Sequence, residues 1–144
     1  MVIMNTYLNF PGTTEEAFNF YKSVFGGDFA GEINRFKDTP DGEKLPAADQ
    51  NKVMHIALPV GEHNMLMGTD ILESTGQSLT MGNNMHLSLH PDSKGEAEKL
   101  FAGLSAGGDI SMPFQKMFWG DWYGQFTDKY GVHWMINYHD PSSG

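Results

Sequence analysis

The feature that most constrains the fold is an internal repeat. The segment "MNTYLNFPGTTEEAFNFYKSVFGGDF" (residues 4–29) aligns with "MHLSLHPDSKGEAEKLFAGLSAGGDI" (residues 85–110). In each copy, a stretch of alternating polar and apolar residues precedes a segment whose apolar residues recur at helical spacing. A repeat of this kind indicates two similar modules, each beginning with a strand and a helix.

The two predicted helices share the same start and stop signals. Each opens with a hydroxyl residue followed three positions later by glutamate, a pattern typical of a capping box, and each closes on two glycines. The capping pairs are Thr13 with Glu16 and Ser93 with Glu96. Apolar stripes at helical spacing, which we expect to pack on a sheet, comprise Ala17, Phe20, Tyr21 and Val24 in the first copy and Ala97, Leu100, Phe101 and Leu104 in the second.

The later parts of the two copies also correspond. The segments "GEHNMLMGTD" (residues 61–70) and "GVHWMINYHD" (residues 131–140) each follow a predicted strand, at 52–60 and 122–130, so Gly61 and Gly131 are expected in hairpin turns. Residues 30–36 and 110–118 supply the remaining strands, and the polar segment 38–51 is predicted to be a long surface loop. The pattern predicts an α+β fold of two βαβββ modules, at about residues 1–72 and 84–140, joined by a linker at 73–83.

Composition limits the partners. The chain of 144 residues has 18 Asp and Glu against 9 Lys and Arg, a net charge of −9 that disfavours nucleic acid. No apolar run has the length of a membrane span, and the first residues lack the pattern of a signal peptide, so we expect a soluble cytoplasmic protein without a membrane partner. The absence of cysteine excludes disulfides, thiolate metal ligands and cysteine nucleophiles.

The tandem repeat resembles the vicinal oxygen chelate superfamily, which includes glyoxalase I, bleomycin-resistance proteins and extradiol dioxygenases. The segments "YLNFPGTTEEAFNFYKSVFGG", "HIALPVGEHNMLMGTD" and "MFWGDWYGQFTDKYGVHWMINY" are similar to its PhnB-like branch. The resemblance implies a single glyoxalase/bleomycin-resistance-like domain over residues 1–144, in which each module curls its sheet into a half-open barrel with the helix on the outer face. It also implies a homodimer whose modules, paired within or across chains, enclose a cavity for a small molecule.

Strand alternation predicts which side chains face that cavity. Leu8 and Phe10, like Leu87 and Leu89, are expected beneath the helices, which turns the alternate residues to the opposite face. The predicted cavity residues are Asn5, Tyr7, Met65, His86, Ser88, Met135 and Trp119.

The resemblance also implies four metal-ligand positions, which fall here on Asn5, Met65, His86 and Met135. Of these, His86 alone is a usual ligand for a divalent cation, because a methionine thioether binds Zn, Ni, Mn or Fe(II) poorly and supplies no negative charge. We therefore expect no cofactor. Two alternatives stay open: a divalent metal held with the help of His63, His133 or His139, and Cu(I) held by histidine and two methionines.

The run "FQKMFWGDWYGQF" (residues 114–126) is rich in aromatic residues. Trp119 or Tyr123 can wall the cavity and stack on a flat or apolar ligand; alternatively, the run packs at the end of a sheet or in a dimer interface. Asp121 and Asp128 are expected to act in turns, and Asp128 is expected to cap the backbone there.

The function predicted from these features is binding or sequestration of an apolar or aromatic compound without the usual metal site. The alternatives are a divalent-metal-dependent lyase, isomerase or dioxygenase, and a structural or regulatory dimer with a filled cavity, so the sequence leaves open whether the protein is an enzyme. Members of the PhnB-like branch have also been labelled ubiquinone methyltransferases. The sequence has no glycine-rich turn opening a βαβ nucleotide-binding unit, so we do not expect that activity.

Overall fold

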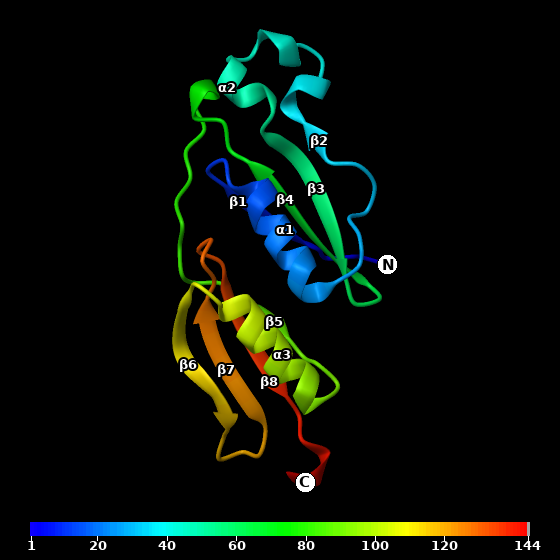
Figure 1. Cartoon of the computed structure of the whole chain (residues 1–144), viewed down its shortest axis with the longest axis vertical. Helices are drawn as coiled ribbons and strands as arrows, with labels where there is room; N and C mark the ends of the chain where they lie inside the picture. Colours follow the sequence, from blue (N-terminus) through cyan, green and yellow to red (C-terminus); the bar gives the residue numbers. More distant parts are fainter. Residues whose placement is uncertain (144) are drawn as a thin grey trace. The chain divides into compact units, whose positions relative to one another are not determined.

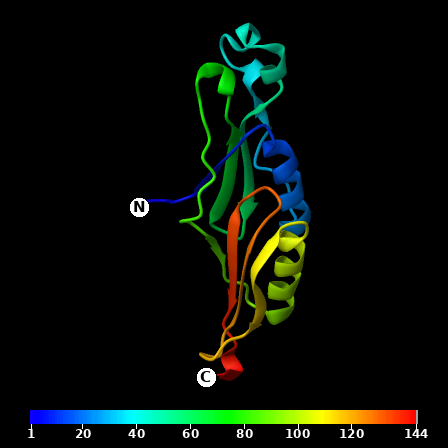
Figure 2. The ribbon, with the colours of Figure 1, turned by 90° about the vertical axis from the view of Figure 1, so that its left-hand side faces the viewer.

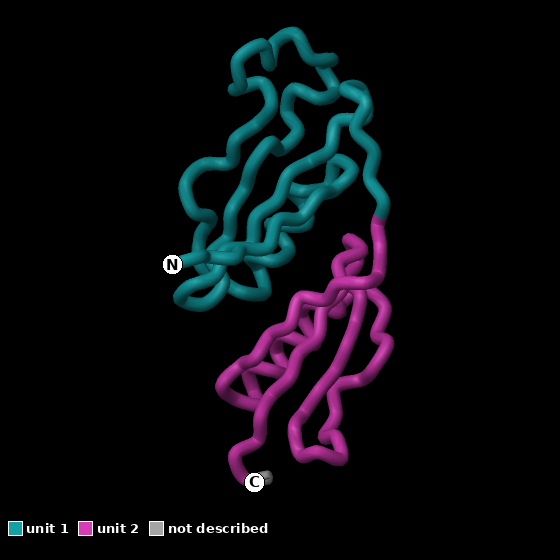
Figure 3. The backbone as a smooth tube through the Cα atoms, turned by 180° about the vertical axis from the view of Figure 1, so that it is seen from behind, with its two compact units in different colours: residues 1–80 teal, residues 81–144 magenta. Residues whose placement is uncertain are grey.

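The computed structural model describes residues 1–143. The chain forms two compact units, residues 1–80 and residues 81–144 (Figure 3). Each unit is a four-stranded mixed sheet with one long helix on one face (Figures 1 and 2). The predicted α+β fold of two βαβββ modules is confirmed. Within residues 1–143, none of the helices combines the length and the apolar character needed to cross a bilayer.

The strand order is the same in both units. Unit 1 has the order β1-β4-β3-β2 and unit 2 the order β5-β8-β7-β6, and in each the first strand pairs in parallel with the last while the other pairs are antiparallel. The elements of unit 1 are β1 (Thr6–Phe10), α1 (Thr14–Phe25), β2 (Asn34–Arg35), α2 (Ala47–Gln50), β3 (Val53–Val60) and β4 (Asn64–Asp70). The elements of unit 2 are β5 (Leu87–Leu89), α3 (Lys94–Ser105), β6 (Asp109–Lys116), β7 (Trp122–Thr127) and β8 (His133–Tyr138).

A helix aromatic ring over a strand glycine fixes the helix on the sheet in both units. A Cβ atom added to Gly68 of β4 would lie 2.6 Å from the Phe18 ring, and one added to Gly124 of β7 would lie 2.5 Å from the Phe101 ring. Phe18 is fully buried and Phe101 nearly so, and burial of such a ring contributes about 1.5–3 kcal/mol. The predicted stripe of α1 was right for Ala17 and Tyr21, which are buried, but it left out Phe18 and included Phe20 and Val24, which are only half-buried. Phe18 packs on the sheet because Gly68 leaves room for its ring.

The starts of the two helices differ. Ser93 accepts a hydrogen bond from the backbone N–H of Glu96 at 3.1 Å, as predicted for that cap. The predicted cap by Thr13 was wrong, because its side chain makes no capping bond. Instead Asp70, at the end of β4, accepts from the backbone N–H of Thr14 at 3.0 Å and from its hydroxyl at 2.6 Å. A buried carboxylate from the sheet thus satisfies the first backbone donor of the helix, that of Thr14.

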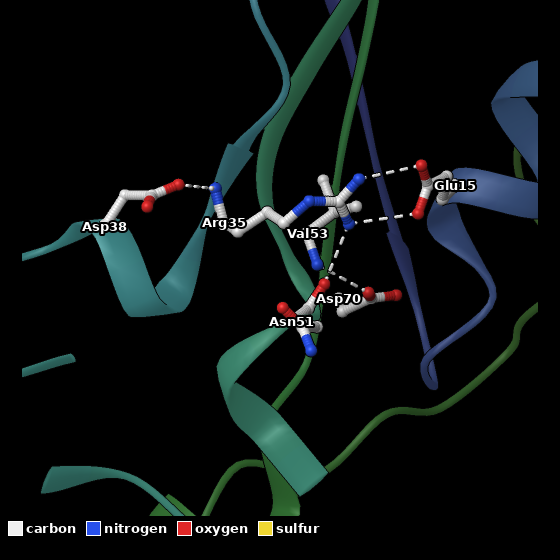
Figure 4. A network of polar contacts seen from close by, with 6 residues as sticks. All are labelled: Glu15, Arg35, Asp38, Asn51, Val53 and Asp70. Carbon is white, nitrogen blue, oxygen red and sulfur yellow. Dashed lines mark hydrogen bonds and ion pairs between the residues drawn. The ribbon is translucent and has the colours of Figure 1, made fainter. Parts of the chain in front are cut away.

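The predicted strand over residues 30–36 is reduced to Asn34–Arg35, with an irregular register against β3. Arg35 is held by a network of contacts (Figure 4): its guanidinium donates to both carboxylate oxygens of Glu15, at 3.0 and 2.8 Å, and to the carbonyl of Asn51 at 2.8 Å. The Arg35 hydrogen bond lowers the pKa of Glu15. The two hydrogen bonds to Glu15 hold the segment against the start of α1, and its pairing with β3 stays short.

Residues 38–51 were predicted to be a surface loop, and this was only partly right. The segment contains a helical turn at Gly42–Lys44 and the short helix α2, and it buries the carboxylate of Asp49. Asp49 accepts a short hydrogen bond from the Ser74 hydroxyl and forms an ion pair with Lys52 at 2.9 Å.

This buried carboxylate predicts a pH-dependent part of the stability. The hydrogen bond from Ser74, followed by the one from Lys52, lowers the pKa of Asp49 below its ordinary value of 3.8. A carboxyl with a depressed folded pKa stabilises the fold above its unfolded pKa, and the contribution disappears as the pH falls through the folded pKa. We therefore expect Asp49→Asn to lower the free energy of unfolding at neutral pH, and the difference from wild type to shrink below pH 3.8.

Urea denaturation of both proteins over a series of pH values measures this difference. Asp41→Asn is the matched control, since Asp41 also pairs with a lysine, Lys44, but both side chains are 74% exposed. A difference for Asp49→Asn that stays constant down to the acid transition would contradict the prediction.

Candidate functional site

The face of the unit 2 sheet opposite α3 is the candidate site. Ser88 pairs with Met135, Gln125 with Met135 and Thr127 with His133, and the intervening residues Trp134 and Phe126 are buried beneath the helix. Alternation therefore puts the paired side chains on the opposite face, as predicted for Ser88 and Met135. We name this surface the unit 2 strand face; it comprises His86, Ser88, Tyr123, Gln125, Thr127, His133, Met135 and Asn137.

A row of hydrogen bonds runs across the centre of the unit 2 strand face. The Gln125 amide donates to the Tyr123 hydroxyl at 2.5 Å, and that hydroxyl donates to the Met135 sulfur at 3.7 Å. The Ser111 hydroxyl bonds the amide oxygen of Gln125 at 3.5 Å. The row holds a phenol and an amide in fixed orientations beside an apolar thioether. A few fixed polar groups among apolar side chains are typical of sites for small molecules.

Two histidines lie side by side on this face but have different bonding. The His133 Nε2 atom is 2.8 Å from the carbonyl oxygen of Gly82, which can only accept, so Nε2 carries a proton. The His133 Nδ1 atom is 2.8 Å from the Thr127 hydroxyl. His86 is exposed, with its ring centroid 5.5 Å from that of His133. His133 would therefore have to give up a hydrogen bond to join His86 in binding a metal.

In unit 1 the predicted residue Tyr7 lies near His55, which sequence reasoning missed, and the predicted residues Asn5 and Met65 contact each other. Asn5 Oδ1 accepts from the backbone N–H of Met65 at 3.2 Å, and the Tyr7 hydroxyl is 3.3 Å from His55 Nδ1. Asn5 and Met65 also line a groove of about 610 Å³ beside the N-terminal segment. The sequence of β3 does not indicate a site at His55, because the three residues after it, Ile56–Leu58, are all apolar and buried, so polar and apolar residues do not alternate there.

The four family ligand positions do not fit a hard divalent cation. The side-chain oxygen of Asn5 already accepts a backbone hydrogen bond, two of the other three positions are methionines, and His86 supplies no negative charge. Among residues 1–143, no three His, Cys, Asp or Glu side chains gather in an arrangement that could hold a metal. Of the alternative histidines, His63 is exposed beside Glu62 and lines the same groove as Asn5 and Met65, whereas His139 contacts Asp121.

The aromatic run at 114–126 divides between the core and an exposed turn. Phe126 is buried with its ring centroid 5.1 Å from that of Phe101, so part of the run packs beneath α3. Trp119 lies in the turn between β6 and β7, where it is 49% exposed and its ring centroid is 6.3 Å from that of Tyr123. The exposed part therefore lies next to the unit 2 strand face.

The two predicted turn aspartates bond differently. Asp128 accepts from the backbone N–H groups of Tyr130 and Val132 at 2.8 and 3.1 Å, which confirms the predicted cap. Asp121 lies next to the β6–β7 turn, as expected, but its carboxylate accepts from Asn137 at 3.1 Å and from His139 at 2.8 Å. Sequence reasoning missed that pairing.

Comparison with known proteins gives one family and a common fold. The family model described as 3-demethylubiquinone-9 3-methyltransferase matches residues 3–137. The crystal structure of protein PA1353 from Pseudomonas aeruginosa is 36% identical, with a TM-score of 0.83, and the match covers 96% of this chain and 98% of that one. The PhnB protein from Bacillus cereus is 27% identical, with a TM-score of 0.75 and coverage of 94% and 98%.

A more distant structure shares the fold alone. A glyoxalase/bleomycin resistance protein/dioxygenase family enzyme from Burkholderia phytofirmans PsJN is 14% identical, with a TM-score of 0.61 and coverage of 93% and 95%. The two proteins therefore share the fold although their sequences have little in common.

Proposed function

The chain belongs to the 3-demethylubiquinone-9 3-methyltransferase family and to the PhnB-like branch of the vicinal oxygen chelate superfamily, and from this we propose that it binds a small apolar or aromatic molecule on the unit 2 strand face. The observation that carries the proposal is the fixed row of Gln125, Tyr123 and Met135, with His86 and Ser88 on the same face. Methionine adapts its shape to an apolar ligand, while the phenol and amide select its orientation.

The family description alone does not support methyl transfer here. Rossmann-type nucleotide binding uses a glycine-rich turn between a strand and the start of a helix. The connection from β1 to α1 holds one glycine, Gly12, and residues 90–93 between β5 and α3 hold none. We therefore base the proposed function on the strand face rather than on the family description.

Binding without a divalent cation is the second part of the proposal. It is supported by the donor chemistry at the family ligand positions, where Met65 and Met135 replace anionic ligands and the Asn5 oxygen accepts a backbone hydrogen bond. On this account the ligand is held by apolar contact and by hydrogen bonds to neutral groups.

The expected result for Met135→Ala is weaker binding of a neutral aromatic probe, 4-nitroanisole, by about three- to tenfold, because part of the apolar surface that covers the ring is lost. Isothermal titration calorimetry on the full chain measures the affinity. Met85→Ala is the control, since Met85 is 74% exposed and precedes His86 outside the unit 2 strand face. Equal affinities for wild type, Met135→Ala and Met85→Ala would contradict the proposed site.

A further inference from the structure

An oriented histidine lies at the end of the unit 2 sheet, where the β6–β7 turn meets the end of β8. Figures 1 and 2 both show these two segments at the same end of unit 2. His139 Nδ1 lies 2.8 Å from Asp121 Oδ1, and the Asn137 amide donates to the other oxygen of Asp121 at 3.1 Å. The Asn137 amide therefore orients the Asp121 carboxylate, and the carboxylate in turn orients the His139 imidazole.

The bonding determines which nitrogen of His139 is available. Asp121 is ionised at neutral pH, since the hydrogen bond from Asn137, followed by that from His139, lowers its pKa. An ionised carboxylate can only accept, so the neutral imidazole carries its proton on Nδ1 and presents a lone pair on Nε2. The His139 side chain is 73% exposed, and no group among residues 1–143 bonds its Nε2 atom. A carboxylate that orients an imidazole in this way creates a proton acceptor.

The neighbouring carboxylate, Asp140, has hydrogen-bond partners of its own, and its negative charge opposes the lowering of the Asp121 pKa without outweighing it. Asp140 accepts from the backbone N–H of Ser142 at 2.9 Å and from its hydroxyl at 2.6 Å. These bonds direct Asp140 to the end of the chain and leave Asp121 as the hydrogen-bond partner of His139.

The aromatic surface beside the pair is held in place by the turn. The backbone N–H of Met117 donates to the carbonyl of Asp121 at 2.8 Å, and that of Gly120 donates to the carbonyl of Met117 at 3.0 Å. Gly120 has φ +99°, a conformation that favours glycine. Trp119 is therefore presented on a closed turn, half exposed, between the rings of Phe118 at 4.9 Å and Tyr123 at 6.3 Å. An exposed indole on a fixed backbone offers a face for a planar ring at a low cost in entropy.

We propose that this end of unit 2 binds a phenol, a planar hydroxyaromatic compound whose ring packs on Trp119 and whose hydroxyl proton passes to His139 Nε2. The O–H bond breaks, its electron pair stays on the phenol oxygen, and the proton forms an N–H bond on the imidazole. Asp121 stabilises the resulting imidazolium, so the products are a phenolate and an imidazolium paired with a carboxylate. This inference rests on the proposed function and names the chemical class of its ligand.

The test compares 4-nitrophenol with 4-nitroanisole, its methyl ether, on the full chain at a pH below the phenol's own pKa. We expect the phenol to bind about tenfold more tightly than the ether, as for a hydrogen bond to a charged group, and to show the absorption band of the phenolate when bound. His139→Gln is expected to remove both the preference and the phenolate band. Asp121→Asn is expected to weaken the band, because the amide does not stabilise the imidazolium. Trp119→Leu is expected to weaken binding of both probes.

The matched control is His63→Gln, which removes another exposed histidine beside a carboxylate, Glu62 at 3.6 Å, from unit 1. It should leave the preference and the band unchanged. Equal affinity of wild type for the two probes, or a phenolate band that survives in His139→Gln, would overturn the inference. If 4-nitroanisole still binds in a way that depends on Met135, the inference alone fails; if neither probe binds, the proposed function fails with it.

Discussion

Replacement of Asp128 by alanine is expected to lower the free energy of unfolding by about 3–5 kcal/mol, because three donors lose their acceptor in the interior. The Asp128 carboxylate is 3% exposed and accepts from two backbone N–H groups of the β7–β8 turn, those of Tyr130 and Val132. It also accepts from the indole N–H of Trp134 at 2.9 Å, and that tryptophan is 2% exposed in the core of unit 2. Urea denaturation monitored by tryptophan fluorescence measures the loss.

Two further variants make this prediction specific. Asp128→Asn should lower the free energy of unfolding by less than Asp128→Ala does. Its amide oxygen can still accept from the backbone N–H groups of the turn, while its amide nitrogen faces the Trp134 donor and cannot accept from it. Asp92→Ala removes an exposed aspartate next to the cap Ser93 and should change the free energy of unfolding by less than about 0.5 kcal/mol. Equal losses for Asp128→Ala and Asp92→Ala would show that the three bonds do not stabilise the unit.

Replacement of Asp70 by alanine is expected to have an effect of similar size in unit 1, about 3–5 kcal/mol. Asp70 is 3% exposed and joins three elements: it accepts from the Thr14 backbone and hydroxyl at the start of α1, and from the backbone N–H of Val53 at the start of β3 at 2.9 Å. Its removal leaves the helix start without a cap and Val53 with an unsatisfied buried donor, as Figure 4 shows for the Val53 contact. Chemical denaturation followed by far-UV circular dichroism measures this loss, since it reports on the α1 helix.

The control for Asp70 is Asp28→Ala. Asp28 is 93% exposed and pairs at 3.4 Å with Lys22, a surface contact worth about 0–1 kcal/mol. A loss for Asp70→Ala no larger than that for Asp28→Ala would contradict the assigned role of Asp70.

Features with local causes could be predicted from the sequence. The glycines that end both long helices, the hairpin turns at Gly61 and Gly131 and the cap at Ser93 each depend on residues within a few positions, and all are present. The repeat predicted the fold class because both copies carry the same order of these local signals.

Features decided by distant partners were predicted less well. Thr13 has a capping pattern, but Asp70 from the far end of β4 serves the helix start instead. The alternation of residues 30–36 predicts a full strand, but Arg35 bonds to Glu15 twenty positions earlier and the strand shortens. In both places a hydrogen bond to a charged group from another element overrides the structure that the local sequence favours.

The candidate site shows the same division. Alternation predicted the face of Ser88 and Met135, because one side of that sheet is buried under a helix. It could not predict the pairing of Asp121 with His139, since no sequence spacing indicates that a turn and the end of a strand meet.

The central claim is that the unit 2 strand face binds a small aromatic molecule without a divalent cation. Calorimetric titration of 4-nitroanisole into chelator-treated protein, repeated after addition of Zn or Mn and with Met135→Ala and His86→Ala, tests it most directly. We expect the same affinity with and without the cation, and a lower affinity for Met135→Ala. Binding that appears only after the cation is added, and that is lost in His86→Ala, would contradict it and would favour a metal-dependent enzyme.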